Sequence, residues 1–172
     1  MASDWMMNNT KQLDPRDADW DNLNRLIKKK FNKICAKRNV IDAKVQWYHK
    51  HYNWDSFAKI YSKKLDMSKG DDPLLNGFAW DIFINITDKA VLNKIIPWMK
   101  KLVQKYPQAD DALDTYANLL YKAGRKQEAI QWEEKAVSVA SAAHKSEYYV
   151  VIEEMKNGQP TYLSQGAIWS VR

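Results

Sequence analysis

Cysteine, glycine and proline are all scarce in this chain of 172 residues. The single cysteine, Cys35, excludes a disulfide within the chain and any Cys-x-x-Cys redox chemistry. Five glycines and five prolines leave few residues for tight turns, which argues against an all-β fold. Cys35 itself is expected on an apolar helix face, where a thiol behaves as a small hydrophobic group.

Long apolar runs are also missing. No stretch approaches the roughly 18–20 apolar residues of a membrane helix, so no membrane span is predicted. The first residues, MASDWMMNNTKQLD, combine neither a basic start nor an apolar run. They are therefore not expected to act as a signal peptide as they stand.

Motifs of catalytic and metal sites are absent as well. The sequence has no Ser-His-Asp spacing, glycine-rich phosphate loop or His-Glu-x-x-His pattern. His49 and His51 point to different sides of a helix, and His144 is distant in sequence, so no metal site is predicted. The acidic pairs are Asp71–Asp72, Asp110–Asp111 and Glu133–Glu134. The first two precede predicted helices, where carboxylates cap free amides. We predict no catalytic residue and no cofactor, although a pocket built from distant residues stays open.

The positive charge is concentrated in one part of the chain. The net charge is +6, yet residues 20–69 alone have +9 and residues 70–172 have −1. A basic patch is predicted at Arg25, Lys28, Lys29, Lys30, Lys33, Lys37 and Arg38. Lysine and arginine beside aromatic residues can bind phosphates, so anion or nucleic-acid binding is an alternative function. Charge runs more often form a solvated helix face, which makes a nucleic-acid partner the less favoured reading.

Apolar residues at helical spacing predict an all-α chain of about seven to nine helices. The expected helices cover residues 19–37, 40–53, 54–66, 74–86, 89–106, a hairpin from 114 to about 142, and 143–158. Asp17 or Asp19 is expected to cap the first helix, and Asp88 the helix of residues 89–106. Pro97 inside that helix predicts a kink.

The two ends of the chain differ from this pattern. Residues 1–18 form a polar segment without clear periodicity, and Gly158 is expected to end the last helix. The tail, residues 159–172, is apolar at Tyr162, Leu163, Ile168 and Trp169. We expect it to pack against another surface, with a neighbouring chain as one option.

A repeat of 34 residues links the last two hairpins, since IIPWMKKLV and AIQWEEKAV align Trp98 with Trp132. The stretch DTYANLLYKAGRKQEAIQWEEKAV resembles a tetratricopeptide repeat, whose length is 34 residues. The small positions and the turn match at Ala117, Gly124, Ala129 and Ala136, and the departures are Leu113, Leu120, Glu133 and Ser141. The resemblance implies a right-handed array of antiparallel helical hairpins, a tetratricopeptide-like α-solenoid, as one domain over residues 19–158.

A second resemblance covers residues of about 40–160. The tokens AW, TDK, W-x-K-K, DTYANLLYK-x-G and A-I-x-W-E-E-K-A are similar to the C-terminal helical half of bacterial thioredoxin-family proteins, mostly envelope proteins. The redox motif of that family has no counterpart here. The resemblance therefore implies a repeat module without its redox domain, accessory to a thioredoxin-like protein, and it suggests an envelope or periplasmic location.

In a tetratricopeptide array, the first helix of each pair lines a groove. The groove positions transfer to Asn76, Trp80, Phe83, Asp114, Asn118, Tyr121 and Lys122. Aromatic, amide and charged groups together suit an extended peptide, although Trp80 and Phe83 are equally compatible with a core. Trp47, Tyr48 and Tyr52 are expected in the core. The predicted function is non-catalytic protein interaction with a protein or peptide partner, and self-assembly into a homo-oligomer is an alternative.

Overall fold

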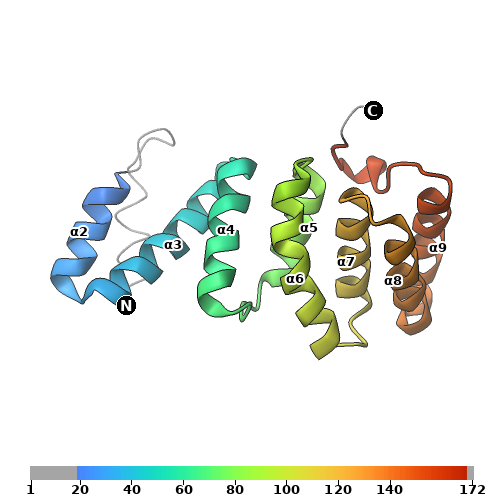
Figure 1. The fold of residues 1–172 in the computed structure, drawn as a ribbon, viewed down its shortest axis with the longest axis horizontal. Helices are drawn as coiled ribbons and strands as arrows, with labels where there is room; N and C mark the ends of the chain where they lie inside the picture. Colours follow the sequence, from blue (N-terminus) through green and yellow to red (C-terminus); the bar gives the residue numbers. More distant parts are fainter. Residues whose placement is uncertain (1–18, 170–172) are drawn as a thin grey trace. The chain divides into compact units, whose positions relative to one another are not determined.

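A computed structural model describes residues 19–169 of the protein (Figure 1). This part of the chain is all-α, as predicted, and contains no β-strand. Its helices are α2 (Trp20–Lys30), α3 (Lys33–Lys50), α4 (Trp54–Ser68), α5 (Leu75–Asn85), α6 (Lys89–Lys105), α7 (Asp110–Lys122), α8 (Lys126–Val139), α9 (Ala142–Lys156) and the 3₁₀ turn η1 (Leu163–Gln165).

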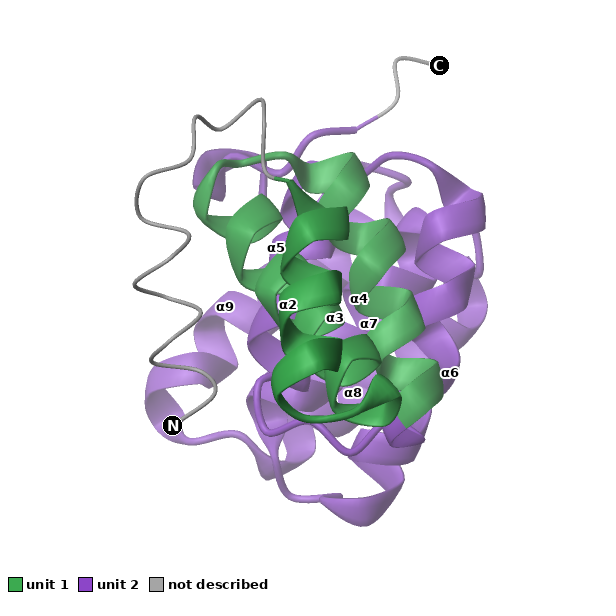
Figure 2. Ribbon diagram, turned by 90° about the vertical axis from the view of Figure 1, so that its left-hand side faces the viewer, with its two compact units in different colours: residues 1–67 green, residues 68–172 purple. Residues whose placement is uncertain are grey.

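The chain divides into two compact units, residues 1–67 and 68–172 (Figure 2). The repeat domain predicted over 19–158 is shared between these units, and the tail from residue 159 belongs to the second unit. The predicted polar segment 1–18, with the cap Asp17, lies outside the described residues.

The first unit corrects one predicted helix. The prediction of a single helix over residues 19–37 is wrong, because α2 ends at Lys30 and a new helix, α3, begins at Lys33. The side chain of Asn32 accepts a hydrogen bond from the Cys35 backbone N–H at 2.8 Å. An asparagine that binds a nearby amide this way favours a helix start over a helix interior. The expected cap is confirmed at Asp19, which accepts from the Asn22 N–H at 2.9 Å.

The break near Asn53 is confirmed, since α3 ends at Lys50 and α4 begins at Trp54. Tyr52 adopts a positive φ of 55° there. Its side chain is 75% exposed, so its expected place in the core is wrong, whereas Trp47 is buried as expected. The turn directs the Tyr52 ring outward, and a core position was inferred from its apolar character alone.

The two histidines of this unit contact aromatic rings. The His51 ring lies 4.2 Å from the Trp47 ring, and His49 lies 5.1 Å from Phe57. Both imidazoles therefore have aromatic neighbours within the first unit.

In the second unit each helix packs against the next one, and α5 also packs against α7. Asp88 caps α6 as predicted, accepting from the Ala90 N–H at 2.8 Å. Pro97 lies inside α6, and the kink stays a prediction. Gly124 forms the turn between α7 and α8 with a φ of +94°, a conformation that glycine adopts without strain.

The small positions of the hairpin α7–α8 are fully buried. Ala117, Ala129 and Ala136 have no exposed surface, which fits a close helix crossing. Glu133, between the last two on the same helix face, is also fully buried. A carboxyl group thus lies in the core of the hairpin.

Candidate functional site

The C-terminal tail, residues 159–169 as described, lies on the helix face that the sequence predicted as a groove. We call this surface the α5–α7 face; its residues are Asn76, Trp80, Phe83, Asp114, Asn118, Tyr121 and Lys122. Both helices supply residues because α5 packs against α7. The five members from Phe83 onward are buried, and Asn76 and Trp80 are half-buried.

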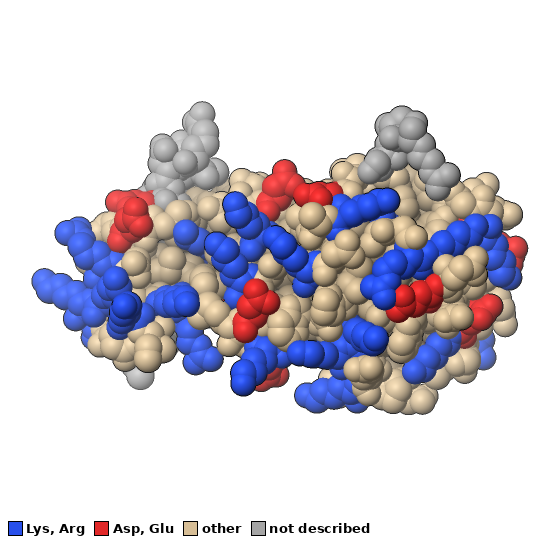
Figure 3. Space-filling model, in the orientation of Figure 1, with Lys and Arg blue, Asp and Glu red and all other residues tan. Residues whose placement is uncertain are grey.

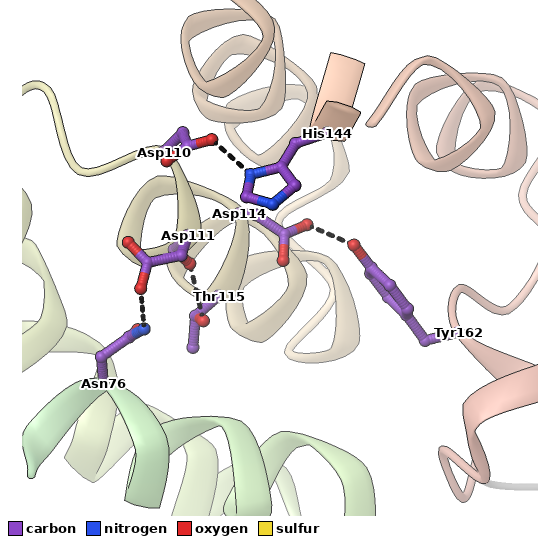
Figure 4. A network of polar contacts seen from close by, with 7 residues as sticks. All are labelled: Asn76, Asp110, Asp111, Asp114, Thr115, His144 and Tyr162. Carbon is purple, nitrogen blue, oxygen red and sulfur yellow. Dashed lines mark hydrogen bonds and ion pairs between the residues drawn. The ribbon is translucent and has the colours of Figure 1, made fainter. Parts of the chain in front are cut away.

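Side chains of the tail bind the polar groups of α7. The Tyr162 hydroxyl donates to Asp114 Oδ1 at 2.9 Å (Figure 4). The Thr161 hydroxyl donates to Asn118 Oδ1 at 2.6 Å, and Asn118 Nδ2 donates to Asp114 Oδ1 at 2.8 Å. These bonds form one buried network in which tail and helix satisfy each other's polar atoms.

The backbone of the tail is recognised too. The Tyr121 hydroxyl donates to the Gln159 carbonyl at 2.9 Å, and the Ile168 N–H donates to the Ile84 carbonyl at 2.8 Å. Within the tail, the Trp169 indole N–H donates to the Thr161 carbonyl at 3.1 Å. Main-chain bonds of this kind depend little on sequence, so they suit the binding of a polypeptide segment in general.

Aromatic rings of the tail pack on the face. Tyr162 meets Trp80 edge to face, with ring centroids 4.8 Å apart. Trp169 lies 6.2 Å from the Phe83 ring and 5.5 Å from the Tyr121 ring. Edge-to-face pairs add to the free energy that area burial already supplies.

Lys122 completes this end of the face. Its ammonium group donates to the Phe83 carbonyl and lies 5.4 Å from the centroid of the Trp169 ring. Burial lowers the pKa of Lys122 to about 8. The group keeps its proton at neutral pH, where a cation over an aromatic ring is stabilising.

Two acidic residues lie beneath the tail, on neighbouring helices. Burial raises the pKa of Asp114 to about 7, although the hydrogen bonds from Tyr162 and Asn118 favour its charged form. Burial, together with the charge of Asp114, raises the pKa of Glu133 well above its ordinary value. Among residues 19–169 neither carboxyl oxygen of Glu133 has a hydrogen-bond partner. Burial thus disfavours the charged form of both carboxyl groups.

The neighbouring acidic pair on α7 has a different surrounding. Asp110 accepts a hydrogen bond from His144 Nδ1 at 2.8 Å, and Asp111 accepts one from Asn76 Nδ2 at 3.0 Å (Figure 4). Both acids lie in the first turn of α7, where carboxylates interact favourably with the helix dipole. The expectation that they precede the helix and cap it is wrong, because the N-cap residue is Ala109 and makes no side-chain cap bond. The bond to Asp110 raises the pKa of His144. These contacts link α7 to α5 and α9.

Sequence reasoning selected the residues of the α5–α7 face but missed what covers them. The predicted groove is covered by the chain's own tail, which buries Tyr162 and half-buries Trp169 without a neighbouring chain. The apolar composition of the tail indicated that it packs against some surface, but it did not indicate that this surface is the α5–α7 face. Glu133 was also missed as a site residue, although its spacing between Ala129 and Ala136 placed it on the buried face.

The basic patch lies on α2 and α3 (Figure 3). All seven of its side chains are exposed. Lys28, Lys33 and Lys37 border a hollow of about 320 Å³, which Lys44 and Trp20 also line. The Lys44 ammonium lies 5.4 Å from the Trp20 ring. The patch therefore spans two helices rather than one, because a new helix begins after Asn32.

A larger open hollow of about 660 Å³ lies beside the first turn of α7. Trp98 lines it, and a Cβ added to Gly70 would come within 2.5 Å of that ring. Lys101 lies 4.2 Å from the Trp98 ring, and Lys105 lies 5.1 Å from the Tyr106 ring. The lining has both signs of charge, so it does not point to one class of ligand.

Searches for other features returned little. Among residues 19–169 no group of three or more acidic, histidine or cysteine side chains could hold a metal ion. None of the helices in this range is long and apolar enough to cross a membrane. Comparison with family models, with curated proteins and with solved structures found no match. The α5–α7 face with its tail is therefore the best-defined candidate site.

Proposed function

We propose that this protein is a non-catalytic interaction module that binds an extended polypeptide segment on its α5–α7 face. The supporting observation is the tail itself, which lies on the predicted groove residues through side-chain and main-chain hydrogen bonds and aromatic contacts. A surface that binds one segment of polypeptide so completely has the chemistry to bind another. In this proposal the helices form a tetratricopeptide-like scaffold that holds α5 and α7 side by side.

The test uses the full chain with its tail loosened by Trp169→Ala. A fluorescent peptide with the sequence of residues 159–169, QPTYLSQGAIW, is titrated while its anisotropy is measured. We expect saturable binding at one peptide per chain. A companion variant with Asn118→Leu, which removes the acceptor of the Thr161 hydroxyl, should bind the peptide more weakly. Absence of peptide binding by the loosened chain, shown to be folded by circular dichroism, would contradict the proposal.

The accessory role beside a thioredoxin-like protein rests on the sequence resemblance alone. It predicts that the partner segment comes from an envelope protein with a Cys-x-x-Cys redox domain. A direct binding measurement between this chain and such a purified redox domain tests the role. Binding that ignores an Asn118→Leu change on the α5–α7 face would place the contact elsewhere.

Anion binding is a second candidate function. It is favoured by the convergence of Lys28, Lys33, Lys37 and Lys44 on one hollow beside Trp20. A labelled single-stranded oligonucleotide tests it, because each phosphate contact adds about 0.7 to the slope of log affinity against log salt. A shallow slope that is unchanged by Lys33→Ala with Lys37→Ala would exclude the hollow as a phosphate site.

A further inference from the structure

Beneath the tail lies a set of buried polar side chains, which we call the floor of the site. Asp114, Asn118 and Glu133 are all buried, at 5%, 0% and 0% exposure. Buried polar atoms are costly unless they are hydrogen-bonded. Two of the donors come from the tail, the Tyr162 hydroxyl to Asp114 and the Thr161 hydroxyl to Asn118. The floor is thus complementary to hydroxyl groups of the bound segment, and not to apolar side chains alone.

The position of the Tyr162 ring restricts the bound side chain further. Trp80 and Phe83 enclose the ring at centroid distances of 4.8 and 6.1 Å, both nearly perpendicular to it. The hydroxyl at the far end of the ring reaches Asp114 Oδ1 at 2.9 Å. The site therefore combines walls for an aromatic ring with a strong acceptor at the para position.

Charged and titratable neighbours of Asp114 come from several elements. Glu133 faces it from α8, Glu147 and Tyr148 lie on α9, and Tyr162 is in the tail. Glu147 is exposed, whereas Asp114 is buried and its Oδ1 accepts hydrogen bonds from both Tyr162 and Asn118. A buried acceptor that loses its hydrogen-bond donor bears the cost of its desolvation without compensation.

From these contacts we propose that the α5–α7 face is selective for tyrosine. Asp114 is the specificity-determining residue that accepts the phenol hydroxyl of a partner protein's segment, and Tyr162 of the tail is the chain's own occupant of the same pocket. This inference rests on the proposed function and names the chemistry of its ligand: a Thr-Tyr pair followed, seven residues after the tyrosine, by tryptophan.

A different protein is the better source of that segment than a second copy of this chain. The tail of a second copy makes the same contacts as the tail already in place. The chain's own tail is joined to α9 through only residues 157–160, and this short connection gives it a high effective concentration at the face. The tail of a second copy has no such connection, so it competes poorly for the same contacts. A foreign segment can add contacts that the tail lacks, for example in the hollow that Asn76 also lines.

The experiment compares two peptides on the full chain with Tyr162→Ala and Trp169→Ala, which loosen the tail and leave the face intact. The probes are QPTYLSQGAIW and the same peptide with phenylalanine in place of tyrosine. We expect the tyrosine peptide to bind about tenfold or more tightly, because phenylalanine leaves a buried acceptor short of a donor. With Asp114→Ala added, the two peptides should bind equally.

Other outcomes separate the inference from the proposed function. Equal affinity of both peptides for the loosened chain overturns tyrosine selectivity and leaves peptide binding intact. Absence of binding by either peptide overturns both. A wild-type chain that light scattering shows to be a dimer, and that Tyr162→Ala converts to a monomer, would assign the pocket to a second copy and overturn the assignment to a foreign partner.

A single substitution gives an independent measurement if the double variant does not fold. Tyr162→Phe removes one oxygen from the full chain, and hydrogen exchange then reports the opening of residues 161–169. We expect opening to increase about tenfold or more. Tyr149→Phe is the matched control, because that tyrosine is 58% exposed on α9. Equal exchange in the two variants overturns the role of the hydroxyl.

Discussion

The α5–α7 face and the basic patch were both predicted from the sequence as binding surfaces, yet they are built differently. The side chains of the basic patch are all exposed, and several border an open hollow. Most of the α5–α7 face is buried, and its hydrogen bonds to the tail join residues 38 to 48 positions apart in the chain. The exposure of a helix surface thus depends on whether a segment distant in sequence packs against it. Two surfaces that the sequence predicts equally well as binding sites can therefore differ in exposure.

The largest effect should separate two phenylalanines, one from each surface. Phe83 is fully buried in the α5–α7 face, whereas Phe31 beside the basic patch is 47% exposed. We expect Phe83→Ala to lower the free energy of unfolding by about 3–5 kcal/mol and Phe31→Ala by about 0.5 kcal/mol or less. Urea denaturation measures both, and similar losses would remove the contrast between the surfaces.

The next effect tests the close crossing of α7 and α8. Ala129→Leu adds volume where no surface is exposed, and we expect a loss of about 1–3 kcal/mol from overpacking. Ala143→Leu is the control, since it places the same side chain at an exposed position of α9. A melting temperature of Ala129→Leu equal to that of the control would show that the crossing has room.

The buried acids beneath the α5–α7 face give the second unit a pH-dependent stability. The folded state raises the pKa values of Asp114 and Glu133, so it binds more protons than the unfolded chain. Stability should therefore fall as the pH rises from about 4 through 7 and beyond. Glu133→Gln cannot ionise, so we expect it to flatten this dependence and to gain on the order of 1–2 kcal/mol relative to wild type at pH 8.

Glu134→Gln serves as the matched control for that experiment, because Glu134 is exposed next to Glu133. Denaturation curves at pH 5 and pH 8 supply the comparison. If Glu133→Gln and Glu134→Gln change the two curves alike, the buried acids do not determine the pH dependence.

The smallest effect concerns the exposed pair His144–Asp110. The hydrogen bond raises the pKa of His144 in the folded state, so its contribution is full below the unfolded pKa and is lost as the pH rises through the folded one. We expect His144→Gln to destabilise the protein slightly at pH 5.5 and not at pH 8.5. A loss of the same size at both pH values would mean that the imidazole acts by packing, not by charge.

Local features of the fold were readable from the sequence because their causes are local. The periodicity of apolar residues indicated the helices, and the caps Asp19 and Asp88 and the turn at Gly124 depend on neighbours within a few residues. The same reasoning failed at Phe31 to Asn32. There a side-chain cap competes with a continuous apolar stripe, and the stripe alone does not decide the outcome.

For the candidate site too, local features could be predicted from the sequence, whereas contacts between distant segments could not. The sequence alone determined that the described chain is all-α and that its tail is apolar enough to need cover. The resemblance to a tetratricopeptide repeat suggested which residues of α5 and α7 share a face. Only the tertiary structure decided that the tail covers this face, that Tyr162 meets Asp114, and that Glu133 is buried beside it. The physical reason is that burial and pKa depend on groups brought together across 48 residues of chain, a separation that no local pattern records.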